Sequence, residues 1–165
     1  MVNKNLIMDN KIDMKTNLIL LFFIISSFTL FGQEQTKIKK GKISVPIKKE
    51  LNLKAQIKKG KIIKFEIIEE KVLTEPSEFM SSMDEKPDSF DDIYIKFNKS
   101  DFGILLTVIH KLEKPIIYRA KIKIKGHQDL VDTSIHPCYP NVISVEQWRD
   151  DIEKIELYDF KYYKE

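Results

Sequence analysis

Five side chains that can bind metal or assist catalysis lie close together in this sequence. They are His127, Asp129, Asp132, His136 and Cys138. Imidazole nitrogen, carboxylate oxygen and thiolate sulfur all suit zinc or copper, and loops commonly carry such functional groups. The spacing matches none of the familiar zinc patterns. We therefore treat His127, His136 and Cys138 as candidate metal ligands of the loop 127–138.

A structural role is the alternative for the same residues, with His127 and the aspartates in solvent and Cys138 packed inward. A catalytic Cys138 would need a base that creates its thiolate. His136 is near in sequence, whereas His110 lies in an apolar segment typical of a buried strand. The sequence contains no nucleophile elbow, phosphate-cradling glycine loop or paired-carboxylate motif. It therefore predicts a non-enzymatic protein without a cofactor.

The elements that would position these residues are β-strands. Most of them alternate apolar and polar residues with a period of two, and Gly103–Leu112 is nearly all apolar, as in a central strand. Lys58-Lys59-Gly60 lies between the expected strands 51–57 and 63–67 and predicts a hairpin turn. A phase change in the last strand predicts a β-bulge near Asp159. The expected strands are 51–57, 63–67, 93–97, 103–112, 116–124 and 154–162.

Such a series of strands without strand–helix alternation predicts an all-β fold. We expect an antiparallel β-sandwich, immunoglobulin-like in outline, with a small β-barrel as the alternative. Two long connections, 74–92 and 126–143, interrupt the strands, and the first is expected to be a surface loop. Ser144 and Gln147 have the spacing of a capping box, which predicts one short helix near the C-terminus.

Charge is unevenly distributed along the chain. The formal net charge of the 165 residues is +3, which is too balanced to indicate a nucleic-acid-binding protein. Residues 37–64 contain eleven lysines and one acid, Glu50, whereas residues 65–92 contain ten acids and two lysines. One end of the domain is therefore expected to be basic and another acidic, unless the fold brings the two segments together.

The N-terminal segment has the pattern of a secretory signal peptide. Lys15 precedes the apolar run Leu18–Phe31, which is too short to span a bilayer comfortably as a helix. Met14 is a plausible true start, and cleavage after Gly32 would remove residues 1–32. A retained anchor helix is the alternative. The sequence thus predicts one exported domain, residues 33–165, periplasmic or extracellular, with no transmembrane span after cleavage.

One short segment occurs twice. Ile38–Ile43 and Ile57–Ile62 both read Ile-Lys-Lys-Gly-Lys-Ile. A spacing of this kind is typical of repeated strand–turn units, but two copies are fewer than a solenoid needs. Because the chain is rich in lysine and isoleucine, we interpret the match as a coincidence of composition.

A set of residues in the C-terminal third forms a recognisable pattern: Thr133-Ser134, Pro137, Pro140, Glu146-x-Trp148 and Tyr158-Asp159-Phe160. The pattern resembles a recurring ending among small exported β-domain proteins of the bacterial envelope. The resemblance covers residues 133–160, implies an exported β-domain and transfers no catalytic residues. Physically, Trp148 is expected to cover one end of the fold and Glu146 to accept backbone amides of the loop 133–140.

These observations favour a binding protein. Loops held on a rigid β-scaffold commonly carry binding function, so we expect the partner to be another envelope protein or a polysaccharide. A metal-binding protein with its site in the loop 127–138 is the first alternative. An inhibitor or immunity-type envelope protein is the second. No nucleic-acid partner is expected.

Overall fold

The computed structural model describes residues 34–78 and 87–164. The predicted signal peptide, residues 1–32, lies outside the described residues. Residues Gln35–Glu165 group into one compact unit. Among the described residues, no helix is long and apolar enough to cross a membrane.

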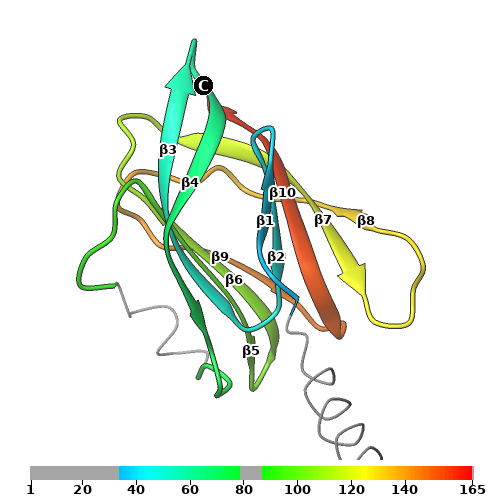
Figure 1. Ribbon diagram of the computed structural model, residues 1–165. Coiled ribbons are helices and arrows are strands. Elements are labelled where there is room, and N and C mark those ends of the chain that lie inside the picture. The colour runs from blue at the N-terminus through cyan, green and yellow to red at the C-terminus, as the bar shows by residue number, and fades with distance from the viewer. Residues whose placement is uncertain (1–33, 79–86, 165) are drawn as a thin grey trace, which may run out of the picture. The chain divides into compact units, whose positions relative to one another are not determined.

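The fold is all-β and antiparallel, as predicted (Figure 1). The ten strands of the described residues form one large sheet in the order β1-β2-β10-β4-β3-β5-β6-β9, with β7 paired to β10 and β8 paired to β7. The sheet does not close on itself, so the β-barrel alternative is wrong. The strands are β1 (Lys37–Lys39), β2 (Lys42–Pro46), β3 (Lys49–Lys58), β4 (Lys61–Val72), β5 (Ile93–Ser100), β6 (Gly103–His110), β7 (Ile116–Ile124), β8 (Val131–Thr133), β9 (Ser144–Trp148) and β10 (Ile152–Tyr162).

Two tight turns close the hairpins β1–β2 and β3–β4. Lys59 and Gly60 join β3 to β4 with φ of 52° and 73°, and Lys40 and Gly41 join β1 to β2 with φ of 50° and 74°. Positive φ at both central residues is the type I′ geometry, which matches the twist of antiparallel strands. The two Ile-Lys-Lys-Gly-Lys-Ile segments therefore form the same type of turn.

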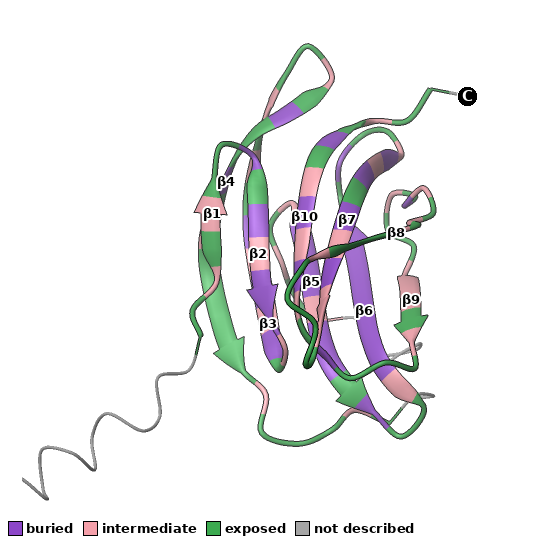
Figure 2. Cartoon of the chain, turned by 90° about the vertical axis from the view of Figure 1, so that its right-hand side faces the viewer, coloured by how far each residue is buried: buried purple, intermediate pink, exposed green. Residues whose placement is uncertain are grey.

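The core collects the inward faces of the long strands. β6 is buried over nearly its whole length, as the apolar run predicted, whereas more buried and less buried residues alternate on β3 and along most of β7 (Figure 2). Three rings pack together: Phe160 stacks on Tyr118 at 4.7 Å and meets Phe65 edge-on at 4.9 Å between ring centroids. Strands from both ends of the sheet order contribute to this one hydrophobic cluster.

The expected short helix at Ser144–Gln147 is wrong, and these residues belong to β9. β9 pairs with β6, with Trp148 opposite Ile104 and Ser144 opposite Val108. Because five residues form few helical hydrogen bonds, an isolated turn of helix is unstable. The open edge of β6 supplies backbone partners instead, and the described residues contain no helix.

One other local expectation is confirmed, and one is corrected. β10 has a register shift between Tyr158 and Lys161, and Asp159 has φ of 55°, so the predicted bulge is present. The connection 126–143 is less irregular than expected, because it contains β8. From β8 the chain continues beside β7 as far as Cys138, which bridges to Ile116.

Candidate functional site

The predicted metal ligands do not converge. Cys138 is buried beneath the sheet edge, with its Sγ 3.9 Å from the Tyr118 hydroxyl. The His136 side chain is 85% exposed and its Nδ1 lies 3.1 Å from Glu146 Oε1. His127 is exposed near the end of β7, where its carbonyl accepts from Lys123 Nζ. No group of three or more His, Cys, Asp or Glu side chains that could hold a metal is found within residues 34–78 and 87–164.

The environment of Cys138 disfavours a thiolate. Burial raises the pKa of its thiol, and this outweighs hydrogen bonds with the Ser144 and Tyr118 side chains. His110, which is fully buried, directs Nε2 to the Cys138 carbonyl at 3.0 Å rather than to the sulfur. Burial also lowers the pKa of His110, against the effect of that hydrogen bond. The arrangement is one of packed structural residues.

Glu146 binds a backbone amide of the loop 133–140, as the sequence predicted, and Trp148 also contacts this loop. Glu146 Oε1 accepts the backbone amide of His136 at 2.9 Å. The Trp148 indole donates to Thr133 Oγ1 at 3.0 Å and packs, partly buried, against the core. These contacts fix the loop to β9 and leave Cys138 on its inner side.

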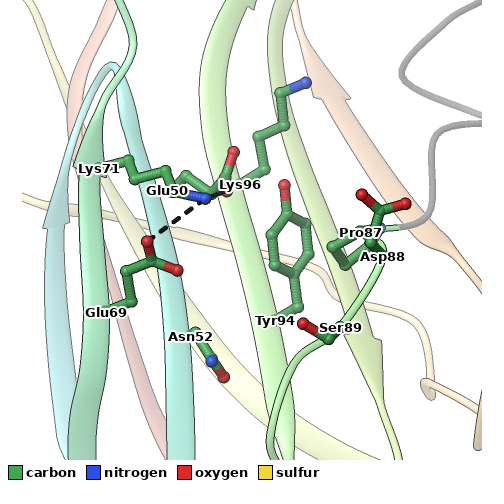
Figure 3. Close-up of a pocket in the computed structure, with 9 residues that line it drawn as sticks. All are labelled: Glu50, Asn52, Glu69, Lys71, Pro87, Asp88, Ser89, Tyr94 and Lys96. Carbon is green, nitrogen blue, oxygen red and sulfur yellow. Dashed lines mark hydrogen bonds and ion pairs between the residues drawn. The ribbon is translucent and has the colours of Figure 1, made fainter.

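A polar pocket of about 400 Å³ lies elsewhere, on the outer face of β4, β3 and β5 (Figure 3). Strand register places six of its side chains in two rows across the three strands, because directly paired residues share a face. The rows are Lys71–Glu50–Lys96 and Glu69–Asn52–Tyr94. Pro87, Asp88 and Ser89 line the side beyond β5 and complete what we call the polar pocket.

The charges in the polar pocket largely neutralise each other. Lys71 Nζ lies 3.3 Å from Glu50 Oε1 and 3.5 Å from Glu69 Oε1. The hydrogen bond with Glu50, then the charges of Glu50 and Glu69, raise the pKa of Lys71. The ammonium group therefore stays charged throughout the neutral range and bridges two carboxylates (Figure 3).

The segment that lines the far side of the pocket is anchored to the sheet. Asn52 Nδ2 donates to Asp91 Oδ2 at 3.0 Å, and the Asp91 amide donates back to Asn52 Oδ1 at 2.8 Å. One residue further on, Asp92 Oδ2 accepts the Ala55 amide at 2.7 Å. Lys111 Nζ donates to the Phe90 carbonyl at 2.6 Å and lies 4.1 Å from the centroid of its ring. The pocket is thus formed before any ligand arrives.

A second hollow of about 430 Å³ continues along β5. Lys96 lines both hollows, so they lie next to each other. Asn98, two positions further along the strand, donates through Nδ2 to the Glu75 carbonyl at 3.0 Å and to Ser77 Oγ at 2.8 Å. These bonds hold the segment Thr74–Glu78, which forms the opposite wall. Together the hollows extend over several residues of β5.

Sequence reasoning missed this site. Its residues occur at alternate positions of three strands and individually look like ordinary solvent-facing side chains. The available signal was the alternation itself, with Glu50 and Asn52 on one strand and Tyr94 and Lys96 on another. The pairing register and the course of residues 87–89 were needed to bring them together. Comparisons with protein-family models, curated proteins and solved structures found no significant match to this chain.

Proposed function

We propose that this protein is an exported, non-enzymatic binding module that holds a segment of envelope polysaccharide along the outer face of β4, β3 and β5. The observation that carries the proposal is the polar pocket, pre-formed and continued by a second hollow along β5. Its volume falls within the range of small-molecule sites. An elongated ligand with repeated hydroxyl groups fits two adjoining hollows better than a compact one.

The chemistry of the lining supports a neutral sugar. Carboxylates accept hydrogen bonds from hydroxyls, ammonium groups donate to them, and the polar pocket contains both beside the Tyr94 ring. Lys71, Glu50 and Glu69 already compensate one another, so these three side chains offer little to a charged ligand. A ligand rich in uncharged hydroxyls can share these groups without separating the ion pairs.

Export and the finer architecture belong to the same proposal. The segment 1–32 has the signal-peptide pattern, and residues 133–160 resemble exported envelope proteins. A β-sandwich, immunoglobulin-like in outline, is supported by the way strands from both ends of the sheet order share one core. Such a scaffold would hold the described ends of the 74–92 connection, residues 74–78 and 87–92, beside β5.

The intact mass of the full chain, expressed with export and purified without chelator, tests localisation. We expect the mass of Gln33–Glu165 without a metal. An uncut chain would contradict the signal-peptide prediction. A mass increased by one zinc or copper, with the added metal lost in the His136→Ala variant, would instead support a metal site in the loop 127–138.

Binding is tested by titrating the same preparation with a panel of neutral oligosaccharides, three to six sugars long, in a calorimeter. For the tightest binder, Glu69→Gln should weaken binding by about tenfold, since a hydrogen bond to a charged group contributes about 1.5–3 kcal/mol. Glu66→Gln is the matched control, because Glu66 is exposed on the same strand and outside the pocket. No binding by any oligosaccharide, or equal losses in both variants, would refute the proposal. Release of reducing ends during incubation would refute the non-enzymatic part.

A further inference from the structure

A larger hollow, of about 850 Å³, lies at the other end of the β3–β4 hairpin. Three segments meet there: the β3–β4 turn, the β6–β7 turn and the end of β10, which lies beside the outer end of the hairpin in Figure 1. We call it the cationic pocket. It is lined by Lys59, Gly60, Lys61, Lys114, Ile117, Lys161, Tyr162, Tyr163 and Lys164.

Backbone hydrogen bonds hold the frame of the cationic pocket. The Tyr162 amide donates to the Gly60 carbonyl and the Tyr163 amide to the Pro115 carbonyl, both at 2.8 Å. Lys61 and Lys161 are register partners between β4 and β10. The end of β10 is therefore fixed between the two turns, and the lysines that surround the hollow keep their relative positions.

Most of the lysines in this pocket have no carboxylate partner among the described residues. Within the part of the chain that the structure describes, only one of the five forms an ion pair, Lys161 with Asp159 at 3.7 Å. Lys114 Nζ lies 6.0 Å from the Tyr162 ring centroid. Burial, and then the charge of Glu113, raise the pKa of the Tyr162 hydroxyl. A group of lysines with few paired carboxylates attracts anions.

The floor of the pocket is partly apolar. Tyr162 and Ile117 are half-buried, and Tyr163 is exposed. An aromatic ring with a hydroxyl offers an apolar face and a hydrogen-bonding edge to the same ligand. A hollow of this size, with lysines on several sides, is larger than a single small anion would fill. It suits a chain that carries repeated negative charges on rings.

We propose that the cationic pocket binds an anionic sugar polymer, with carboxylate or sulfate groups on the lysines and sugar rings against Tyr162 and Tyr163. That the ligand is a sugar rests on the proposed function, although the cationic pocket is a different surface from the polar pocket. The concave shape disfavours a flat lipid bilayer. The small net charge of the whole chain disfavours nucleic acid, which is bound by proteins with a broad basic excess.

The two copies of the Ile-Lys-Lys-Gly-Lys-Ile segment supply a matched control. Lys59 and Lys40 occupy the same position of the same turn, with φ of 52° and 50°, yet only Lys59 lines the pocket. Replacing either by glutamine removes the same charge from the same local structure. The double variant K59Q/K114Q is compared with K39Q/K40Q, which removes two charges from the β1–β2 hairpin.

The experiment titrates the full exported chain with a sulfated hexasaccharide and an oligogalacturonate hexamer. We expect both to bind, K59Q/K114Q to lose about tenfold in affinity and K39Q/K40Q to stay within about twofold. E69Q should leave this binding unchanged, which separates the cationic pocket from the polar pocket. Absence of binding, or equal loss in both lysine pairs, would overturn the proposal.

Two further probes test the class of ligand. A single-stranded oligothymidylate and phosphatidylglycerol vesicles carry their negative charge on phosphate groups, not on carboxylate or sulfate groups of sugar rings. Weak binding of both, unaffected by K59Q/K114Q, is expected. If either binds more tightly than the oligosaccharides and depends on the same two lysines, the ligand is not a sugar and the proposal fails.

Discussion

The polar pocket and the cationic pocket are both built on the β3–β4 hairpin, but they handle charge in opposite ways. In the polar pocket, Lys71 bridges Glu50 and Glu69. In the cationic pocket, Lys59 and Lys114 have no carboxylate partner among the described residues. A surface whose charges are already paired binds most favourably a ligand that exchanges hydrogen bonds with it. A surface with unpaired charges binds most favourably a ligand of opposite charge.

The contrast follows from the antiparallel course of the hairpin. The lysine-rich segment 37–64 and the acid-rich segment 65–92 meet where β3 pairs with β4. Near the base of the hairpin, Lys49 pairs with Glu70 at 2.7 Å, and Lys71 pairs with Glu50. The tip contains only the lysine-rich part. The fold therefore cancels the charge asymmetry at one end and leaves it in place at the other.

Salt should produce the largest difference between the pockets. Raising the salt from about 0.1 M to about 1 M shortens the Debye length from about 10 Å to about 3 Å. We expect the affinity for the sulfated hexasaccharide to fall at least about tenfold, and that for a neutral oligosaccharide to change less than about twofold. Calorimetric titration at both concentrations measures this. Equal salt sensitivity of the two ligands would remove the distinction drawn between the sites.

The next largest effect is expected on stability, from substitutions in the two type I′ turns at Lys40-Gly41 and Lys59-Gly60. Alanine at a left-handed position costs about 1–2 kcal/mol, so Gly60→Ala and Gly41→Ala should both destabilise the fold. A Cβ at Gly60 would meet only a Tyr162 ring carbon at 3.5 Å, whereas one at Gly41 would lie 3.3 Å from the Ile62 carbonyl oxygen. Gly41→Ala should therefore lower the free energy of unfolding more, as measured by urea denaturation. The reverse order would show that the turn at the cationic pocket is the more constrained one.

Asn52 tests whether side chains, rather than backbone, shape the polar pocket. Asn52→Ala removes both hydrogen bonds with Asp91 and should cost about 1 kcal/mol of unfolding free energy. It should also weaken neutral-sugar binding severalfold, because the segment that lines the pocket loses its anchor. Binding of the anionic hexasaccharide should be unaffected, because the frame of the cationic pocket is held by backbone hydrogen bonds that do not involve Asn52. Unaltered sugar binding in Asn52→Ala would mean that residues 87–89 do not contribute.

Elements with a clear local code could be predicted from the sequence. The alternation on either side of Lys59-Gly60 indicated a hairpin, and the phase change near Asp159 indicated a bulge. Glu146 was expected to accept loop amides and does so. In each case the signal lies within a few residues, where side-chain period and turn chemistry determine the backbone.

Features that depend on distant partners were not predicted. Ser144 and Gln147 have a helical capping pattern, but the free edge of β6 recruits them into β9. His136 and Cys138 are two positions apart, yet one is exposed and the other buried, because Cys138 bridges to Ile116. The polar pocket needs the register of three strands. Period-two patterning gives the face of a residue but not its neighbours.

The smallest expected effect concerns pH and lies outside both pockets. Burial lowers the pKa of His110 below its ordinary value of 6.5, so the unfolded chain binds a proton more readily than the folded one. Its contribution to stability is therefore present above pH 6.5 and is lost as the pH falls through the folded pKa. Urea denaturation should show lower stability at about pH 5.5 than at about pH 7.5, and His110→Gln should reduce that difference.

Sugar binding should not follow the same pH dependence. The side chains that line the two pockets are lysine, tyrosine, carboxyl, amide, hydroxyl and aliphatic groups, with no histidine or cysteine. Histidine and cysteine are the side chains whose ordinary pKa values lie nearest to this pH range. Affinity for both oligosaccharides should thus stay constant while the stability declines. A parallel loss of binding would show that the structure of the pockets on the β3–β4 hairpin depends on the packing around His110.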